Sequence, residues 1–264
     1  MYLCKTLRLQ GTNNDKTMAH RFYVPETLAS GQRLRLPDEE ASHLTRALRL
    51  EAGAAIRVFD GCGHEFTARV DTVSRTGVLV ETQTSIDPTP EPEVAVTLAQ
   101  AVLKGRHFDA VVRDATMLGV ATIQPLLTTY TDMRKSAALR PALHSRWQRV
   151  AIAAAKQSGR AFVPHVREVA SFDEHLSQLA NTTHLILVEP GHVCAAAGPE
   201  KWRHRAPPSS ATLSVGPEGG WTDAELTHAT AEGAEPVTFG TRTLRADAVP
   251  VVALSVLQFA WGDL

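Results

Sequence analysis

The sequence predicts an α/β protein in two parts, a small β-barrel with one helix followed by an α/β domain with a largely parallel sheet. Three observations predict this division. Apolar and polar residues alternate through the segment 54–85. A proline-rich stretch, SIDPTPEPEV, follows at 85–94. After it, short apolar runs alternate with segments of helical periodicity, which is typical of strands joined by helices.

The first part reads as a meander of three strands. IRVFD, HEFTARVDTV and VLVETQTS are separated by Asp60-Gly61 and by SRTG, and an Asp-Gly pair between alternating runs predicts a hairpin. Before them, AHRFYV predicts a first strand, and PDEEASHLTRALRL (37–50) predicts a helix with one apolar face. The segment 1–17 is polar and rich in turn formers, so we expect a loosely ordered extension, with Met18 as a candidate natural start.

The second part alternates strands and helices throughout its length. We expect strands at 94–102, 122–130, 162–166, 184–190, 211–216 and 236–240, and helices at 108–119, 143–159, 172–180, 222–232 and 246–260. The expected organisation is therefore an extension at 1–17, a barrel domain at 18–84, a linker at 85–93 and an α/β domain at 94–264.

Composition is that of an ordinary globular protein, with 44% hydrophobic and 21% charged residues. No apolar run approaches the roughly 18–20 residues that span a bilayer, and the N-terminus lacks a secretory pattern. Three distant cysteines, Cys4, Cys62 and Cys194, fit a reducing compartment. We therefore expect a cytoplasmic protein. The 11 histidines include no H-E-x-x-H and no C-x-x-C accompanies them, so we expect no metal site.

Charge is distributed unevenly along the chain. Residues 100–170 hold 11 Lys and Arg against 4 Asp and Glu, and residues 171–264 hold 5 against 11. A basic zone on a nearly neutral protein fits a polyanionic partner. A set of solvated helix faces explains the same numbers equally well.

A glycine-rich loop at 216–220, GPEGG, lies between a buried strand and a helix that the capping-box pattern TDAE (222–225) predicts. Ligands of α/β proteins bind in such loops. Because Glu218 would repel a phosphate and no P-loop lysine is present, a ligand here would be neutral or cationic. Two further loops, 187–191 and 239–249, have the same layout, so the three could line one pocket. The alternative is a sharp turn that binds nothing.

GPEGGWTDAEL followed by FGTRTLRADA resembles the ribosomal RNA small-subunit methyltransferase E family of the SPOUT class, which methylates N3 of a uridine in 16S rRNA. The resemblance covers nearly the whole chain after residue 18. It includes HRFYV and HLTRALRLEAGAAIRVFDGCGHEFTARV in the first part, and KGRHFDAVVRDATMLGV and RWQRVAIAAAKQSGR in the second.

The resemblance implies a PUA-like RNA-binding β-barrel joined to a SPOUT methyltransferase domain with a C-terminal trefoil knot. It also implies a homodimer that acts on 16S rRNA or the 30S subunit with S-adenosylmethionine as cofactor. For the apolar C-terminal stretch, a dimer contact and a buried core helix both remain open. The implied cofactor-binding residues are Leu187, Val188, Glu189, Pro190, Gly191, Gly216, Pro217, Glu218, Gly219, Gly220, Phe239, Gly240, Leu244, Arg245 and Ala246.

Methylation of N3 requires loss of its proton or stabilisation of the developing anion, and Arg242 and Arg245 beside the cofactor loop are the expected catalytic residues. A phosphate contact or an internal ion pair is the alternative for both. No convincing general base is evident, and only Glu218 and Asp247 are candidates. Expected phosphate contacts are Arg21, Arg46, Arg49, Lys104, Arg106 and Arg160.

The chain also departs from the family pattern. The family usually shows R-x-E-T-A, where this chain has Arg245 followed by Ala246-Asp247-Ala248. Met117 and Lys156 each replace a glutamate of the family motifs. These losses of acid and hydroxyl groups leave two alternatives to the favoured activity: a catalytically silent RNA-binding paralogue, or an enzyme with another RNA target.

Overall fold

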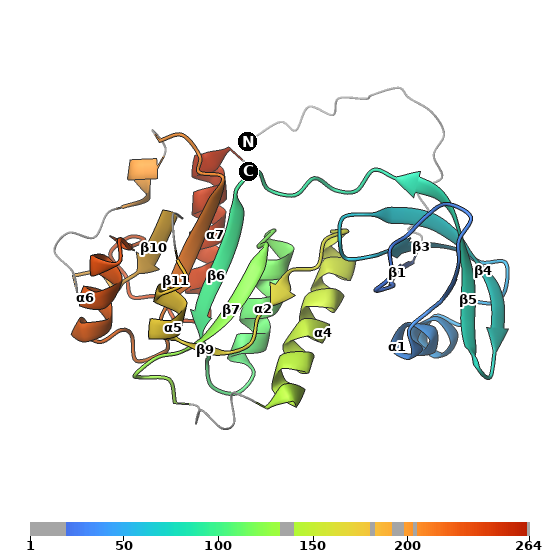
Figure 1. Ribbon diagram of the computed structural model, residues 1–264, viewed down its shortest axis with the longest axis horizontal. Coiled ribbons are helices and arrows are strands. Elements are labelled where there is room, and N and C mark those ends of the chain that lie inside the picture. Colours follow the sequence, from blue (N-terminus) through green and yellow to red (C-terminus); the bar gives the residue numbers. More distant parts are fainter. Residues whose placement is uncertain (1–19, 133–139, 180–182, 192–197, 203–204, 263–264) are drawn as a thin grey trace, which may run out of the picture.

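A computed structural model describes residues 20–132, 140–179, 183–191, 198–202 and 205–262. It contains two sheets, which lie side by side along the longest axis of the molecule (Figure 1). The expectations for the extension 1–17, for a start at Met18, and for Cys4 and Cys194 fall outside these residues.

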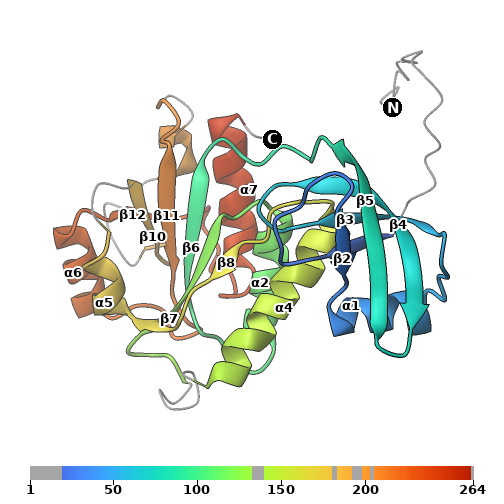
Figure 2. The same cartoon turned by 45° about the vertical axis from the view of Figure 1, so that its right-hand side comes forward.

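The N-terminal sheet is built around alternating side chains, as predicted. Its strand order is β1 (Arg21–Tyr23), β3 (Ala55–Phe59), β4 (Glu65–Ser74), β5 (Gly77–Ile86) and β2 (Arg33–Arg35). β1 runs parallel to β3, and the other pairs are antiparallel. Helix α1 (Asp38–Ser42) continues into a π-helical turn, η1 (His43–Ala47), and packs beside β5 (Figure 2). Strand β2 is only three residues long, and the sequence analysis missed it.

Every strand pairing in the second sheet is parallel. The strand order is β12 (Glu235–Val237), β10 (Thr183–Leu187), β11 (Ser210–Val215), β6 (Ala95–Ala101), β7 (Thr122–Leu127) and β8 (His165–Val166), and β9 (Ala170–Ser171) also pairs with β7. The predicted strand–helix alternation is confirmed for this part.

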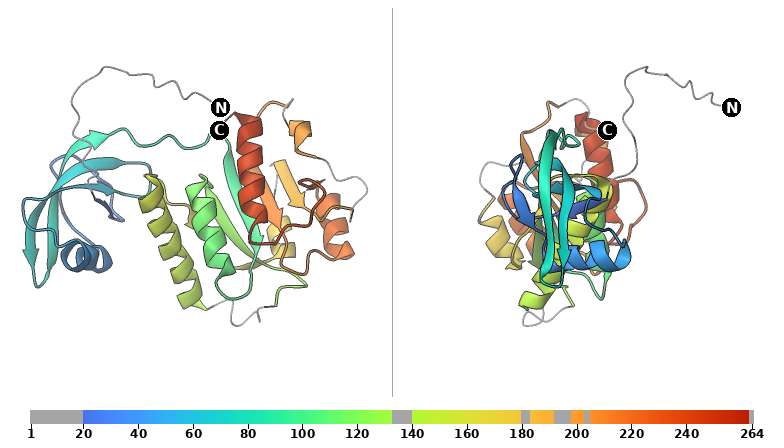
Figure 3. Two further views of the ribbon diagram at one scale, coloured as in Figure 1. Left: turned by 180° about the vertical axis from the view of Figure 1, so that it is seen from behind. Right: turned by 90° about the vertical axis from the view of Figure 1, so that its right-hand side faces the viewer.

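Both faces of the parallel sheet are covered, because its strands are apolar on both sides. α2 (His107–Met117), α4 (Pro141–Ser158) and α7 (Val249–Trp261) pack on one face with the short 3₁₀ helix η2 (Pro199–Trp202). The three long helices stand side by side when the molecule is seen from behind (Figure 3). α5 (Phe172–Leu176) and α6 (Asp223–Ala231) cover the other face. Neighbouring residues on one strand therefore enter different cores, as Leu98 and Ala99 do.

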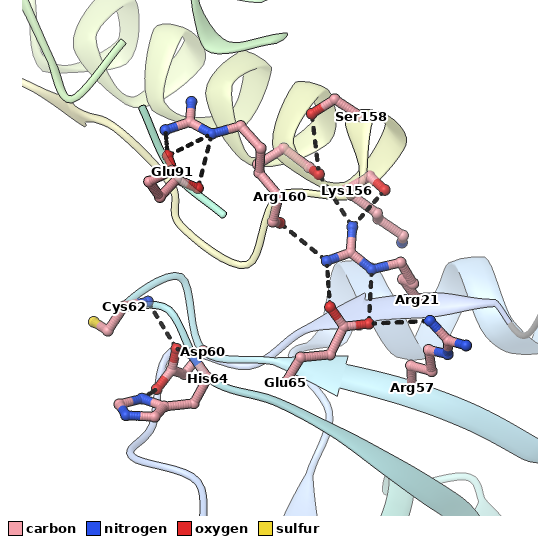
Figure 4. Close-up of polar contacts among 11 residues, drawn as sticks. Arg21, Arg57, Asp60, Cys62, His64, Glu65, Glu91, Lys156, Ser158 and Arg160 are labelled. Carbon is pink, nitrogen blue, oxygen red and sulfur yellow. Dashed lines mark hydrogen bonds and ion pairs between the residues drawn. The ribbon is translucent and has the colours of Figure 1, made fainter. Parts of the chain in front are cut away.

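A buried joint connects the two sheets (Figure 4). From β1, the Arg21 guanidinium donates to both oxygens of Glu65, at 3.0 and 2.8 Å. It also donates to the carbonyl oxygens of Ala155, Lys156 and Arg160 at the end of α4. A cation at this position is favourable because a helix C-terminus carries partial negative charge.

A second arginine ties down the proline-rich segment that leaves β5. Arg160 forms an ion pair with Glu91 and donates to the carbonyl oxygens of Thr116 and Val120. One residue further along, Pro92 packs against Gly119, where a Cβ atom would lie 2.5 Å from the proline ring. The segment between the sheets is thus anchored to the end of α2.

These contacts correct the expectation that Arg21 and Arg160 contact RNA. Their side chains are only 12% and 6% exposed, and their guanidinium groups face acceptors of the protein itself. Both residues add to the positive charge that the sequence shows, but this charge is used inside the joint. Backbone hydrogen bonds between Gly61 and Val163 and between Gly63 and Ala161 add to the same contact.

Candidate functional site

A cavity of about 580 Å³ lies where the loops after β10, β11 and β12 meet. This size is typical of a site for a small molecule. Because the three strands are parallel neighbours, their carboxyl ends reach the same edge of the sheet. Most residues of the predicted pocket line the cavity, and Gly191 and Gly240 do not. Those that do are Leu187, Val188, Glu189, Pro190, Gly216, Pro217, Glu218, Gly219, Gly220, Phe239, Leu244, Arg245 and Ala246, together with Arg242.

Buried polar contacts hold the loops in place. The Gln100 side chain, fully buried at the end of β6, donates to the carbonyl oxygens of Val215 and Gly216. The indole N–H of Trp221 donates to the carbonyl oxygen of Leu187 at 2.9 Å, which links the loop after β11 to the strand β10. The predicted capping box is confirmed, since Thr222 accepts from the Glu225 N–H at 3.2 Å and the Glu225 carboxylate accepts from the Thr222 N–H at 2.9 Å.

Two glycines of the 216–220 loop allow close packing within the protein itself. A Cβ atom at Gly216 would lie 3.2 Å from the Trp221 indole, and one at Gly219 would lie 2.9 Å from Cβ of Tyr130. Space beside them is therefore already used by aromatic side chains.

One wall of the cavity is a charged cluster. Arg245 donates to both oxygens of Asp247, at 3.0 and 2.9 Å, and Nδ1 of His107 lies 2.9 Å from the same carboxylate. The bond from Arg245 is the main reason that the pKa of Asp247 is lowered. The same bond raises the pKa of Arg245. Nearby, Glu218 accepts the backbone N–H of Lys104 at 3.1 Å.

The polar cavity residues His107 and Thr238 were not among the predicted site residues. His107 lies 140 residues from its partner Asp247, and no motif joins them. Its position just after β6, which the sheet order places beside β11, is the feature that could have identified it. Thr238 also lines the cavity, and its buried hydroxyl has no hydrogen-bond partner among the described residues.

The other four predicted RNA-binding residues are exposed. Arg46 lies in η1 and Arg49 lies two residues after its end, next to the N-terminal sheet. Lys104 and Arg106 lie just before α2. Lys104 lines the cavity and forms an ion pair with Asp132 at 2.8 Å.

Across the described ranges, no group of three or more metal-ligating side chains is present. None of the helices in the same ranges is long and apolar enough to cross a membrane.

Comparison with known proteins identifies both parts of the chain. Residues 90–258 match the family model described as RNA methyltransferase domain, and residues 36–83 match the RNA methyltransferase PUA domain. A ribosomal RNA small subunit methyltransferase E from Synechocystis sp. is 34% identical over 243 residues, which cover 91% of this chain and 78% of that protein. The chain belongs to this methyltransferase family.

Solved structures of similar proteins extend the likeness to the fold. The methyltransferase E from Neisseria gonorrhoeae, bound to S-adenosylmethionine, aligns with a TM-score of 0.82 and 32% identity over 92% of this chain and 98% of that one. A putative methyltransferase from Legionella pneumophila, also in complex with this cofactor, aligns with a TM-score of 0.83 and 31% identity, with the same coverage. The methyltransferase fold and its PUA domain are thus shared along nearly the whole chain.

Proposed function

We propose that this member of the family uses S-adenosylmethionine to methylate N3 of a uridine in the 16S rRNA of the small ribosomal subunit, in the cytoplasm. The observation that carries the proposal is the cavity formed by the three loops, in a chain that aligns over almost its full length with cofactor-bound relatives. In this proposal residues 18–84 are the RNA-binding domain, 94–264 the methyltransferase domain, and 85–93 their linker.

The cavity residues fit the chemistry of this cofactor. Leu187, Pro217 and Phe239 offer apolar surface to an adenine ring, and the unpartnered hydroxyl of Thr238 offers a hydrogen bond. The carboxylates of Glu189 and Glu218 suit a positively charged sulfonium, whereas a phosphate-binding loop would not suit it. When bound, the cofactor supplies an activated methyl group, and the protein supplies alignment and electrostatics.

Arg242 and Arg245 supply positive charge on the cavity wall. Uracil N3 carries a proton at neutral pH, and its loss leaves negative charge on the ring. Cations placed beside that charge lower the barrier because they are already oriented before the reaction. Asp247 holds the Arg245 guanidinium in place through two hydrogen bonds.

RNA would lie across the exposed cations of both parts of the chain. Arg46 and Arg49 belong to the first part, whereas Lys104 and Arg106 are close to the cavity. Such residues position a nucleic acid through its phosphates, and binding through them weakens as salt concentration rises. The target uridine would then be specified by groups closer to the cavity.

We also propose that the chain forms a homodimer through α7. One face of this helix, with Ala253, Leu254 and Leu257, is buried in the core. On the other, the large apolar side chain of Phe259 is 57% exposed. In this proposal α7 is both a core helix and a dimer contact, the two roles that the sequence left open. Sedimentation analysis of Phe259→Glu would give a monomer where the wild type gives a dimer. The C-terminal trefoil knot stays a prediction.

The alternative of a catalytically silent paralogue rested on the altered R-A-D-A segment. In the structure, Asp247 reaches Arg245 with two hydrogen bonds, so the altered segment forms a charge pair in the cavity wall. That geometry favours an active enzyme.

Transfer of labelled methyl from S-adenosylmethionine to 30S subunits that lack the modification would test the proposal, with N3-methyluridine sought by mass spectrometry. Product with the wild type and strong loss with Arg242→Ala are the expected results. Cofactor binding without any product would contradict the proposed activity and favour the silent paralogue. A methylated nucleoside other than N3-methyluridine would point to another target.

A further inference from the structure

The proposed reaction leaves one role without a residue, the base that removes the proton from N3 of the uracil ring. The nitrogen can attack the methyl carbon only through a lone pair that this proton blocks. The identity of the base rests on the proposed function, because only transfer to a protonated nitrogen requires one.

The carboxylates of the cavity wall are poorly suited to this role. Asp247 is engaged by Arg245 and His107, and these contacts lower its pKa, which makes it a weaker proton acceptor. Glu218 already accepts the backbone N–H of Lys104. Carboxylates as a class titrate near pH 4, whereas a general base works best when its pKa is close to the working pH, as that of an imidazole is.

His107 is the one imidazole among the described residues of the cavity wall. It is the first residue of α2, its side chain is 48% exposed, and it shares the wall with Arg242 and Arg245. A bound substrate can therefore reach the ring from the cavity side, next to the cations that would stabilise the uracil anion.

The hydrogen bond to Asp247 determines which ring nitrogen is free. Nδ1 of His107 lies 2.9 Å from Oδ2 of Asp247 and 3.4 Å from Nη2 of Arg245. The contact with the carboxylate is the shorter of the two, and an ionised carboxylate only accepts hydrogen bonds. Nδ1 therefore carries the proton in the neutral ring, and the lone pair is on Nε2. This nitrogen has no hydrogen-bond partner within the described part of the chain. The arrangement is that of an oriented histidine base supported by a carboxylate.

We propose that His107 is the general base of the methyl transfer and that Asp247 is its positioning residue. Nε2 of His107 takes the N3 proton, and the electron pair of the N3–H bond becomes the lone pair that bonds to the methyl carbon. The carbon–sulfur bond breaks with its electron pair left on sulfur. The positive charge of the sulfonium thus ends on the His107 imidazolium, which Asp247 stabilises.

Charged groups on every neighbouring element influence this imidazole. Lys104 and Arg106 precede it on its own segment, Arg242, Arg245 and Asp247 come from the loop after β12, and Glu218 comes from the loop after β11. The activity of the wild type should rise with pH, because only the neutral ring accepts a proton. In His107→Gln the shape of that dependence should change, because the N3 proton must then leave to solvent instead of to the ring.

The experiment compares His107→Gln with a matched control, His228→Gln. His228 on α6 also bonds an aspartate through Nδ1, at 3.0 Å from Asp173, and it is 46% exposed, but it does not line the cavity. Single-turnover methylation of 30S subunits would be measured from pH 6 to 9, and cofactor affinity would be measured by calorimetry. We expect His107→Gln to lower the rate about 100-fold or more, with cofactor affinity unchanged, and His228→Gln to match the wild type.

A substrate with 5-fluorouridine at the methylated position gives a second readout. Fluorine withdraws electrons and makes the N3 proton easier to lose, so it should restore much of the rate of His107→Gln. Unchanged rate and pH dependence in His107→Gln would overturn the proposed base while leaving the methyltransferase activity intact. Absence of N3-methyluridine with the wild type would overturn the proposed function, and the base with it.

Discussion

Two arginine–carboxylate pairs in this molecule have nearly the same geometry and opposite surroundings. Arg21 and Glu65 in the joint form two hydrogen bonds of 3.0 and 2.8 Å, with side chains 12% and 4% exposed. Arg245 and Asp247 at the cavity form two of 3.0 and 2.9 Å, with side chains 73% and 22% exposed. The bond is the same, so the difference in burial determines what each pair contributes.

Burial makes the first pair structural. Neither charge can return to water while the joint is closed, so the two depend on each other and on the carbonyl oxygens at the end of α4. At the cavity, water surrounds the guanidinium and screens the attraction, so little stability depends on it. The same exposure leaves Arg245 available to a substrate.

The largest effect is expected from breaking the buried pair. Arg21→Ala leaves the Glu65 carboxylate buried, with Arg57, 3.9 Å away, as its remaining cation among the described residues, and should lower the free energy of unfolding by about 3–5 kcal/mol. Urea unfolding of the full chain would measure it. The double variant Arg21→Met, Glu65→Leu should be more stable than Arg21→Ala, because it leaves no buried charge. Equal loss in both variants would show that the contacts to α4 dominate.

Breaking the exposed pair should affect rate rather than stability. Arg245→Ala is expected to lower kcat about 10²–10³-fold, the usual cost of removing one group that stabilises a developing anion. Its urea midpoint should match that of the wild type. The conservative variant Asp247→Glu, which lengthens the carboxylate by one carbon, should retain most of the activity. If Arg245→Ala unfolded as easily as Arg21→Ala, the distinction between the two pairs would be lost.

Arg21 and Arg245 also show how much of the structure could be predicted from the sequence. Period-two alternation predicted the meander, and the TDAE pattern predicted the start of α6, because both depend on neighbours in the chain. The three loops at strand ends, together with the family resemblance, predicted most of the cavity. Arg21 was misassigned to RNA, since a charged residue looks the same in sequence whether it is exposed or buried.

Contacts between residues far apart in the chain also could not be predicted from the sequence. The contacts of Arg160 with Glu91 and of His107 with Asp247 join residues 69 and 140 positions apart. No local pattern encodes such a pair, and only the tertiary fold brings its members together. The base proposed above was therefore out of reach of the sequence, whereas the loops around it were not.

Acid should act on another buried polar group, the pair His175 and His184. Burial lowers the pKa of each to about 4, and His184 bonds Ser214 as a neutral ring. Unfolded histidine titrates near 6.5, so the unfolded chain takes up protons first. Stability is complete above pH 6.5 and falls as the pH drops toward 4, by about 2 kcal/mol per histidine at pH 5. Urea unfolding at pH 8 and pH 5 would measure this, and His175→Leu should reduce the difference. An unchanged difference would assign it to other groups.

The smallest effect is expected at Arg33, whose ion pair with Asp71 lies in the same sheet as Arg21 but is exposed, with side chains 63% and 29% accessible. Arg33→Ala should leave the urea midpoint unchanged, because water replaces the lost partner at little cost. Arg21 and Arg33 lie in the same sheet, and each binds one carboxylate. Comparing the two variants therefore tests the effect of burial apart from position in the fold. If Arg33→Ala were as harmful as Arg21→Ala, the N-terminal sheet would depend on its ion pairs wherever they lie, and burial would no longer explain why the joint is structural.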